Sequence, residues 1–275
     1  MTTPSKDLAT YLTHLQSLGR VVFTAAEATK ELGIKHGAFL DAAERLQRRR
    51  SLLRLRPSFY VIVPAHYSSW GAPPPTWFIH DLMHHEHTPY YIGILKAAEL
   101  HGATHHAVME FQVVATKRIR RLRAGRSLIT FFFRKSIQDV RDAITDWKTD
   151  TGRMQISSIE LTALDLFRYS RGAGGTDHIA TVLSDLAPKL DALKLAKLSD
   201  SFERPVVQRL GYILDHLGHK DRATEMWSRT SKHATSMKWV SLDPRTATET
   251  NAAASRSRKN ERWRIIINRV PELDQ

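Results

Sequence analysis

Apolar residues near the start of the chain first recur at i, i+3, i+4 and i+7 and then alternate with polar residues. This change of period predicts helices followed by strands. The predicted elements are helices over residues 8–18, 25–32 and 35–49 and strands over residues 52–56 and 59–63. Thr24 and Glu27 match a capping box at the start of the second helix. Three helices and a hairpin are the element order of a winged helix-turn-helix, which we expect over residues 1–67.

Residues 68–76 are rich in Pro, Gly and Ser, a composition that disfavours regular hydrogen-bond ladders. We expect a linker here, followed by a larger domain over residues 77–275. Ser157 and Glu160 match a second capping box, and residues 246–257 are expected to form a loop. The further predicted elements are helices over 77–85, 91–101, 159–169, 176–186, 191–199 and 205–216, and strands over 108–116, 127–134, 154–157, 239–240 and 262–268.

These elements predict an α+β fold. A winged helix-turn-helix comes first, and a larger mixed α/β domain follows, with a central sheet and a helical C-terminal half.

Charge indicates the kind of partner. Forty-one Lys and Arg residues against 28 Asp and Glu residues give a formal net charge of +13 and an isoelectric point near 10.1, which favours a polyanion. The chain has no cysteine, so disulfides and thiolate metal sites are excluded. No apolar run approaches the length of a membrane span, and we expect a cytoplasmic protein that does not contact a membrane.

The third predicted helix has the pattern of a recognition helix. Ile34, Phe39, Ala43 and Leu46 fall at the core positions. Its first turn would reach base edges in the major groove, so Lys35 and His36 are the expected base-reading residues. Arginine forks after this helix suit phosphates and guanine edges. The candidate DNA-binding residues are Thr24, Lys35, His36, Gly37, Arg45, Arg48, Arg49, Arg54, Arg56 and Ser58. A solvated basic face and a protein-contact module remain alternatives.

A second basic run contains no acidic residue and links the two strands predicted over 108–116 and 127–134. Three interpretations stay open: a solvated hairpin tip, a second contact to DNA, or a surface for an acidic protein partner. Its cationic residues are Lys117, Arg118, Arg120, Arg121, Arg123 and Arg126.

No motif indicates catalysis. His80 and His84 have the i, i+4 spacing of two zinc ligands, but the side chains of His85 and His87 diverge from them, and we expect no metal and no other cofactor. A nucleophilic cysteine, a G-x-S-x-G elbow and a convincing carboxylate set for Mg²⁺ are all missing from the sequence. We therefore expect a protein that is not an enzyme.

Motifs spread over nearly the whole chain resemble the AbiEi family, the antitoxins of type IV toxin–antitoxin systems that act in abortive infection, a phage defence. Each motif is soft, and their order carries the resemblance. They are TAAEATKELGI, ERLQRRRSLLRL, FYVIVP, YYIGILKAAELHG, SSIELTALDLFRY followed by Gly174-Gly175, LGYILDHLG and WRIIIN.

The resemblance implies a winged helix that binds inverted repeats in double-stranded operator DNA and represses its own operon. It also implies a C-terminal domain with antitoxin activity against a nucleotidyltransferase-like toxin, without a stable complex. The DNA-binding role carries over to Lys35, His36, Arg45, Arg48, Arg49, Arg54 and Arg56. Two alternatives remain, a ligand-sensing winged-helix regulator and a metal-dependent nuclease.

Overall fold

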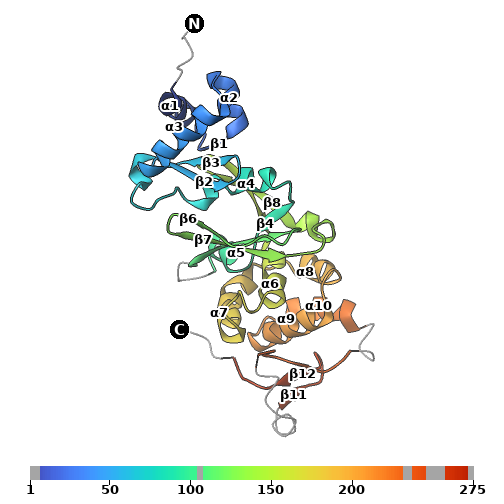
Figure 1. Ribbon diagram of the computed structural model, residues 1–275. Helices are drawn as coiled ribbons and strands as arrows, with labels where there is room; N and C mark the ends of the chain where they lie inside the picture. Colours follow the sequence, from blue (N-terminus) through green and yellow to red (C-terminus); the bar gives the residue numbers. More distant parts are fainter. Residues whose placement is uncertain (1–6, 104–107, 232–236, 246–257, 272–275) are drawn as a thin grey trace. The chain divides into compact units, whose positions relative to one another are not determined.

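The computed structural model describes residues 7–103, 108–231, 237–245 and 258–271 (Figure 1). The expected loop over residues 246–257 lies outside these ranges. The chain divides into two compact units. The first comprises Met1–Tyr91, Met109–Lys135 and Asp146–Gln155, and the second comprises Ile92–Val108, Ser136–Thr145 and Ile156–Gln275.

The first unit begins with the three predicted helices and the predicted hairpin in the predicted order, and strand β1, which was not predicted, lies between the first two helices. Strands β1, β2 and β3 form an antiparallel sheet of order β1-β3-β2, and the three helices precede the β2–β3 hairpin (Figure 1). The prediction of helix, helix, helix and hairpin is confirmed. The elements are α1 (Leu8–Ser17), β1 (Val22–Thr24), α2 (Ala25–Leu32), α3 (His36–Arg48), β2 (Leu52–Arg56) and β3 (Phe59–Ile62).

An aromatic cluster holds α3 against the hairpin. The ring of Phe39 meets the ring of Tyr60 edge-on at 5.3 Å, and Tyr60 stacks on Phe23 at 5.6 Å. Phe39 and Ala43 on α3 are buried, as their spacing predicts. Ring pairs of this geometry contribute about 0.5–1.5 kcal/mol beyond their burial, so the cluster fixes which face of α3 points outward.

Local hydrogen bonds fix the start of α2 and the turn of the β2–β3 hairpin. The Thr24 hydroxyl accepts a hydrogen bond from the Glu27 amide at 3.1 Å, and the Glu27 carboxylate accepts one from the Thr24 amide at 3.5 Å, which confirms the first capping box. At the turn between the strands, Ser58 adopts a φ of 60°. This left-handed conformation usually belongs to glycine, and the Ser58 carbonyl accepts a hydrogen bond from the Ala25 amide at 3.0 Å.

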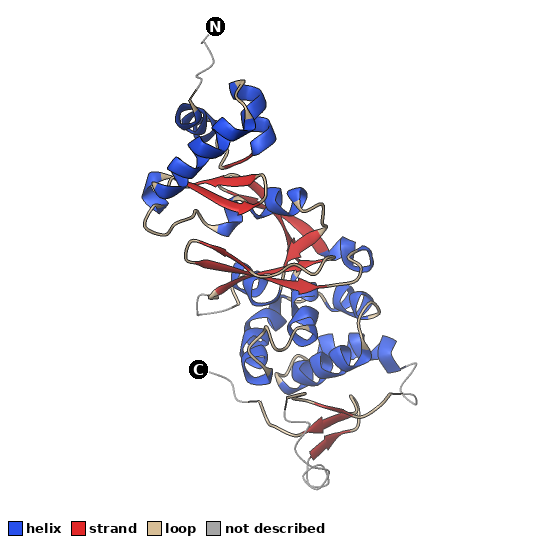
Figure 2. Cartoon of the chain, in the orientation of Figure 1, coloured by secondary structure: helices blue, strands red, loops and turns tan. Residues whose placement is uncertain are grey.

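A six-stranded sheet of order β6-β7-β5-β4-β9-β8 lies mostly in the first unit (Figure 2). Strands β5 and β7 pair in parallel, and β6 pairs antiparallel with β7. The remaining elements of this part are η1 (Ala65–Tyr67), η2 (Pro75–Trp77), α4 (Ile79–His85), β4 (Tyr90–Ile92), β5 (Glu110–Ala115), β6 (Leu122–Ala124), β7 (Ser127–Phe133), β8 (Ile144–Thr149) and β9 (Gly152–Ser157).

The helix predicted over residues 91–101 is wrong at its start. Residues 90–92 form strand β4, all of them buried, and the helix α5 (Ile94–Leu100) begins after Gly93. A short run that is apolar on every position fits a buried strand as well as a helix, and pairing with β9 decides the matter. Strand β8 has no clear apolar alternation, which is why the pattern missed it.

The second unit is mainly helical (Figure 2). The predicted helices in this part are present, while α10 and β11 were not predicted. A small sheet of order β10-β12-β11 closes the described sequence. Besides α5, the elements are η3 (Gln138–Ala143), α6 (Ile159–Arg168), α7 (Thr176–Leu186), η4 (Ala187–Lys189), α8 (Ala192–Ser199), α9 (Arg204–His216), α10 (Lys220–Thr230), β10 (Val240–Ser241), β11 (Arg258–Asn260) and β12 (Ile265–Ile267).

The second predicted capping box is not formed, because a different serine is the N-cap and the third helical residue after it is Leu161. Ser158 is the N-cap of α6 and accepts a hydrogen bond from the Leu161 amide at 3.3 Å. Ser157 is fully buried instead, and its hydroxyl bonds to the Ile92 carbonyl and the Thr162 hydroxyl. A capping side chain must stand beside the first free amides of the helix, and Ser157 is still part of strand β9.

The predicted linker is packed rather than extended through solvent. Residues 68–76 belong to the first unit, and the Trp70 carbonyl accepts a hydrogen bond from the Arg126 amide at 3.0 Å. The domain boundaries at 67 and 77 stay predictions about which parts fold on their own. Among the described residues, no helix has the length and apolar character needed to cross a membrane. The predicted α+β class is confirmed.

Trp263 fixes the small sheet to α9. Its ring lies so close to Gly211 that a Cβ added there would stand 2.4 Å from the ring. The indole nitrogen donates a hydrogen bond to the Asp215 carboxylate at 2.7 Å, and Arg262 pairs with the same carboxylate at 3.1 Å. The glycine is therefore required by the close approach of a fully buried tryptophan.

We expect Gly211→Ala to lower the free energy of unfolding by about 1–3 kcal/mol or more, because the added methyl overpacks a rigid ring contact. Thermal denaturation measures the change. Gly37→Ala is the matched control, since nothing lies within 4 Å of a Cβ at Gly37 and alanine favours a helix by up to about 1 kcal/mol. Equal melting temperatures for the two variants would contradict the assignment of Gly211.

Candidate nucleic-acid interface

The N-terminus of α3 is open to solvent. Lys35 occupies the N-cap position without a side-chain cap hydrogen bond, and Lys35, His36 and Gly37 are all exposed. The His36 ring lies 6.3 Å from the ring of Phe39, which is buried, at an interplanar angle of 26°. Free amides at a helix N-terminus attract phosphate. This end of α3 therefore offers cations, an imidazole and amide donors together.

The five candidate DNA-binding arginines that follow fall into two groups. Arg45, Arg49 and Arg54 are exposed, and none of them forms an ion pair with another described residue. Arg48 is exposed but pairs with Glu44 at 2.6 Å, and Arg56 is half-buried and pairs with Glu86. Only the first group presents its full charge to solvent.

Two further candidates are engaged in local structure. The Thr24 hydroxyl serves the capping box of α2, and Ser58 forms the exposed turn of the hairpin. Neither assignment as a DNA contact has been tested, and both stay predictions.

Glu86 connects the two basic runs. Its carboxylate pairs with the Arg56 guanidinium, and its backbone carbonyl accepts a hydrogen bond from Lys117 Nζ at 2.8 Å. Strands β2 and β6 also approach one another within the first unit. The segments 45–56 and 117–126, far apart in sequence, thus belong to one connected basic region.

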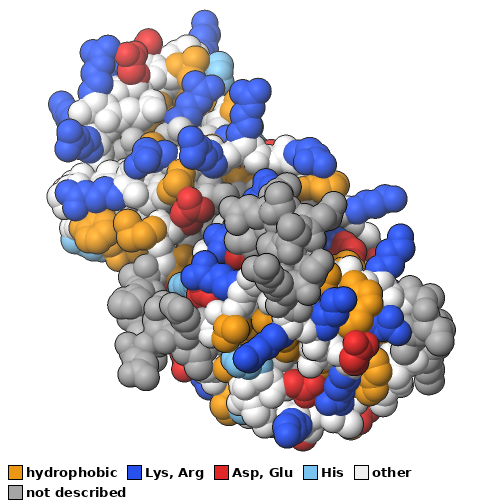
Figure 3. All heavy atoms as spheres, turned by 90° about the horizontal axis from the view of Figure 1, so that it is seen from below, with side chains coloured by type: hydrophobic (Ala, Val, Ile, Leu, Met, Phe, Trp, Pro, Cys, Tyr) orange, Lys and Arg blue, Asp and Glu red, His pale blue; other side chains and the backbone are white. Residues whose placement is uncertain are grey.

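The second basic run is not a hairpin tip between the strands that flank it. Strands β5 and β7 are parallel, so the run is a crossover that contains β6. Its six cationic residues, Lys117, Arg118, Arg120, Arg121, Arg123 and Arg126, are all exposed. Lys and Arg side chains are also more widespread than Asp and Glu on the face drawn in Figure 3.

The histidine-rich segment makes protein contacts instead of converging. His80 Nδ1 lies 3.1 Å from the Tyr90 hydroxyl, and burial raises the pKa of this hydroxyl well above its ordinary value. His85 bonds to the Pro57 carbonyl, and the His84 and His87 rings stand 6.5 Å apart beside a cavity of about 270 Å³. Within the described parts of the chain, no group of three or more His, Cys, Asp and Glu residues could hold a metal ion.

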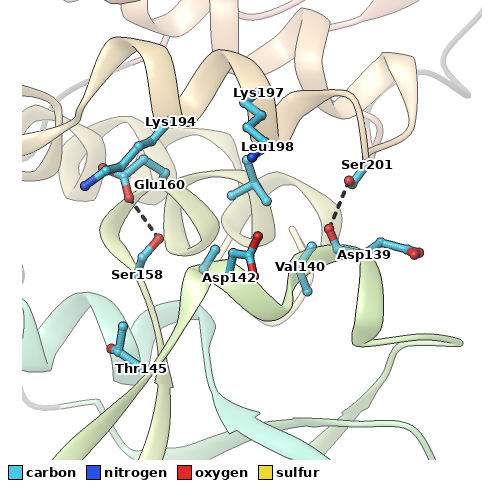
Figure 4. Close-up of a pocket in the computed structure, with 11 residues that line it drawn as sticks. Asp139, Val140, Asp142, Thr145, Ser158, Glu160, Lys194, Lys197, Leu198 and Ser201 are labelled. Atoms are coloured by element: carbon cyan, nitrogen blue, oxygen red, sulfur yellow. Dashed lines mark hydrogen bonds between the residues drawn. The ribbon is translucent and has the colours of Figure 1, made fainter.

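A charged cleft of about 370 Å³ lies within the second unit. Asp142 on η3 and Lys197 on α8 stand on opposite sides with their charged groups turned toward one another (Figure 4). Glu160 is buried at its base, where its carboxylate accepts hydrogen bonds from the Ser158 hydroxyl at 2.8 Å and the Asp191 amide at 3.1 Å. No spacing in the sequence signalled this cleft, because its walls come from three separate segments.

These features define a class of α+β protein with a winged helix at its start and a larger domain after it. Residues 91–216 match the family model of the AbiEi antitoxin C-terminal domain. This stretch of the chain is therefore similar to the AbiEi antitoxin domain, and the resemblance noted in the sequence is confirmed over these residues. Every residue that lines the charged cleft falls within the matched range.

A solved structure shares the fold. The crystal structure of the RV2827C protein from Mycobacterium tuberculosis superposes with a TM-score of 0.64 at 15% sequence identity, and the match covers 93% of this chain and 89% of that one. At this identity the likeness concerns the fold alone. No curated protein sequence matches the chain significantly.

The sequence did not point to Glu86 as a residue of the interface. It lies in the histidine-rich segment, thirty residues from Arg56, and only the packing of α4 beside the hairpin turn brings the two side chains together. Its only signal was that it is the acidic residue between His85 and His87.

We expect Glu86→Gln to strengthen binding to a polyanion, because Arg56 loses its counter-charge while the Lys117 contact to the backbone is kept. One more available cation steepens the dependence of log affinity on log salt by about 0.9 for duplex DNA. A salt titration of DNA affinity measures this. The control is Glu261→Gln, which makes the same charge change at an exposed position of the second unit. The same slope for both variants would refute the role of Glu86.

Proposed function

We propose that this protein is a type IV antitoxin that represses its own operon by binding inverted repeats in duplex DNA, and that it opposes a nucleotidyltransferase-like toxin without catalysis of its own. One observation carries the DNA half: the exposed N-terminus of α3, with Lys35 and His36, is followed by exposed arginines that form no ion pair with another described residue. The antitoxin half rests on the AbiEi domain. Since a repressor acts on the chromosome, we expect a cytoplasmic protein.

The residues at the N-terminus of α3 and the arginines that follow would have different roles in DNA binding. Side chains in the first turn of a recognition helix reach base edges and discriminate sequence. Arg45, Arg49 and Arg54 would neutralise phosphates, which fixes register and orientation but carries no sequence information. The net charge of +13 would speed association with DNA at low salt.

A gel shift across the inverted repeats upstream of the operon tests the DNA half. We expect Lys35→Ala with His36→Ala to cost about 1–3 kcal/mol on the operator and much less on unrelated duplex. Arg49→Ala and Arg54→Ala should weaken both duplexes alike and reduce the salt slope by about 0.9 each. Arg48→Ala is the control, because Glu44 already neutralises that side chain. A double variant at Lys35 and His36 that keeps full operator specificity would refute the assignment of these two residues as base-reading residues.

Co-expression with the neighbouring gene tests the antitoxin half. If that gene encodes the toxin, its expression alone should stop growth, and the full chain should restore it. The double variant at Lys35 and His36 should still restore growth when it is expressed from an unrelated promoter, since repression and neutralisation use different parts of the chain. A neighbouring gene whose product is harmless, or whose toxicity the chain does not change, would refute the antitoxin role.

The charged cleft favours a second candidate, a winged-helix regulator that senses a small molecule. Cavities of roughly 300–1,000 Å³ with a few convergent polar groups are typical of ligand sites, and the cleft of about 370 Å³ carries both signs of charge. The discriminating measurement is operator affinity in the presence of a metabolite panel. A compound that shifts the affinity and loses its effect in Lys197→Ala would favour the regulator.

A further inference from the structure

Two exposed aromatic residues accompany the second basic run. Trp70 is 54% exposed and Phe133 is 39% exposed. The Arg126 guanidinium lies 5.4 Å from the centre of the Trp70 ring, and the Arg118 guanidinium lies 4.6 Å from that of Phe133. The run thus begins and ends beside an aromatic ring that is open to solvent.

Trp70 is held in place by the backbone around it. Its carbonyl accepts the amide hydrogen bond of Arg126 at 3.0 Å. Gly125, with a φ of 55°, approaches so closely that a Cβ there would stand 2.1 Å from the Trp70 carbonyl oxygen. The turn between β6 and β7 (Figure 1) therefore holds the backbone of Trp70 in place, which lowers the entropic cost of using the indole as a contact.

The two aromatic–guanidinium pairs mark the two ends of strand β7. Arg126 directly precedes the strand, and Phe133 is its last residue. Seven residues at about 3.3 Å each give a separation of roughly 20 Å along the strand. Between the pairs lie Arg120, Arg121 and Arg123, all exposed, and the whole run from 117 to 126 contains no acidic residue.

This arrangement suits unpaired nucleotides better than a duplex. In a duplex the faces of the bases are stacked on one another, so an exposed tryptophan gains nothing from it, whereas unpaired bases stack on aromatic rings and guanidinium planes. Arginines along the same path track the phosphates. We infer that the surface formed by Trp70, Phe133 and the basic run 117–126 binds single-stranded nucleic acid, separately from the duplex contact of α3.

An acidic protein is the competing occupant, because tryptophan and arginine are also common at the centre of protein interfaces. Such centres are contiguous and become fully desolvated. Here the two aromatic residues stand at opposite ends of a strand with cations between them, an arrangement that follows a linear polyanion. The observations therefore favour a nucleic-acid strand.

The test is fluorescence anisotropy of the full chain with labelled 12-nucleotide oligo-U and oligo-dT, and with operator duplex in parallel. We expect Trp70→Ala to weaken binding of the single strands by about 5- to 150-fold, the value of one stacked base, and to leave operator affinity within twofold. Trp70→Phe should restore most of the affinity because it keeps an aromatic face. Arg120→Ala with Arg121→Ala should also reduce the salt slope by about 0.7 per lost phosphate contact.

Trp239→Ala is the matched control. This tryptophan of the second unit also contacts two cations, with Lys259 and Arg264 each at 5.5 Å, and its loss should leave both affinities unchanged. A thermal melt of each variant confirms folding. The inference is overturned if Trp70→Ala binds single strands as the wild type does, or if poly-glutamate of equal charge binds as tightly and is equally sensitive to Trp70→Ala. If the wild-type chain binds the single strands but not the operator duplex, the proposed repressor function is refuted and this inference stands.

Discussion

The packing of Phe39 against Tyr60 is the contact on which the candidate interface depends. It joins the first turn of α3 to the hairpin strand β3 and, through Phe23, to strand β1. Because this face of α3 is occupied by rings, Lys35 and His36 stand on the solvent side and the helix N-terminus remains open. A basic surface of defined geometry thus follows from an apolar contact, not from the charges themselves.

The excess of positive charge is the second constraint on the structure. A chain with 13 more cationic than anionic residues must hold its cations apart or pair them. Arg56 is half-buried and is paired with Glu86, while Arg45, Arg49 and Arg54 stand in solvent, where water screens their repulsion. Glu86 also anchors Lys117 through its backbone. One residue therefore joins the two basic runs and reduces the charge that Arg56 presents to a partner.

The two units carry different kinds of surface. The first presents cations and aromatic rings, which suit nucleic acid. The second holds the charged cleft inside the range matched by the AbiEi domain, with Glu160 fixed at its base by two hydrogen bonds. The matched range also contains the basic run 117–126 of the first unit, whereas Lys35 and His36 lie outside it, so variants at these two residues test the proposed repression independently of the proposed neutralisation.

The sequence alone determined the local structure at the start of the chain. Capping residues, apolar spacing and turn residues act between near neighbours, so α1, α2, α3 and the hairpin followed from pattern. The basic runs and the family motifs were also readable directly. The strand at Tyr90–Ile92, the parallel pairing of β5 with β7 and the choice of Ser158 over Ser157 were not.

Tertiary structure decided these because each depends on a partner distant in sequence. A fully apolar run becomes a strand only when another strand pairs with it, and β9 lies more than fifty residues after β4. The same reason applies to the candidate surfaces: Glu86 meets Arg56, Arg126 meets Trp70, and Lys197 faces Asp142 only after folding. The sequence supplied the charges and rings, and long-range packing selected which of them are neutralised, stacked or left exposed.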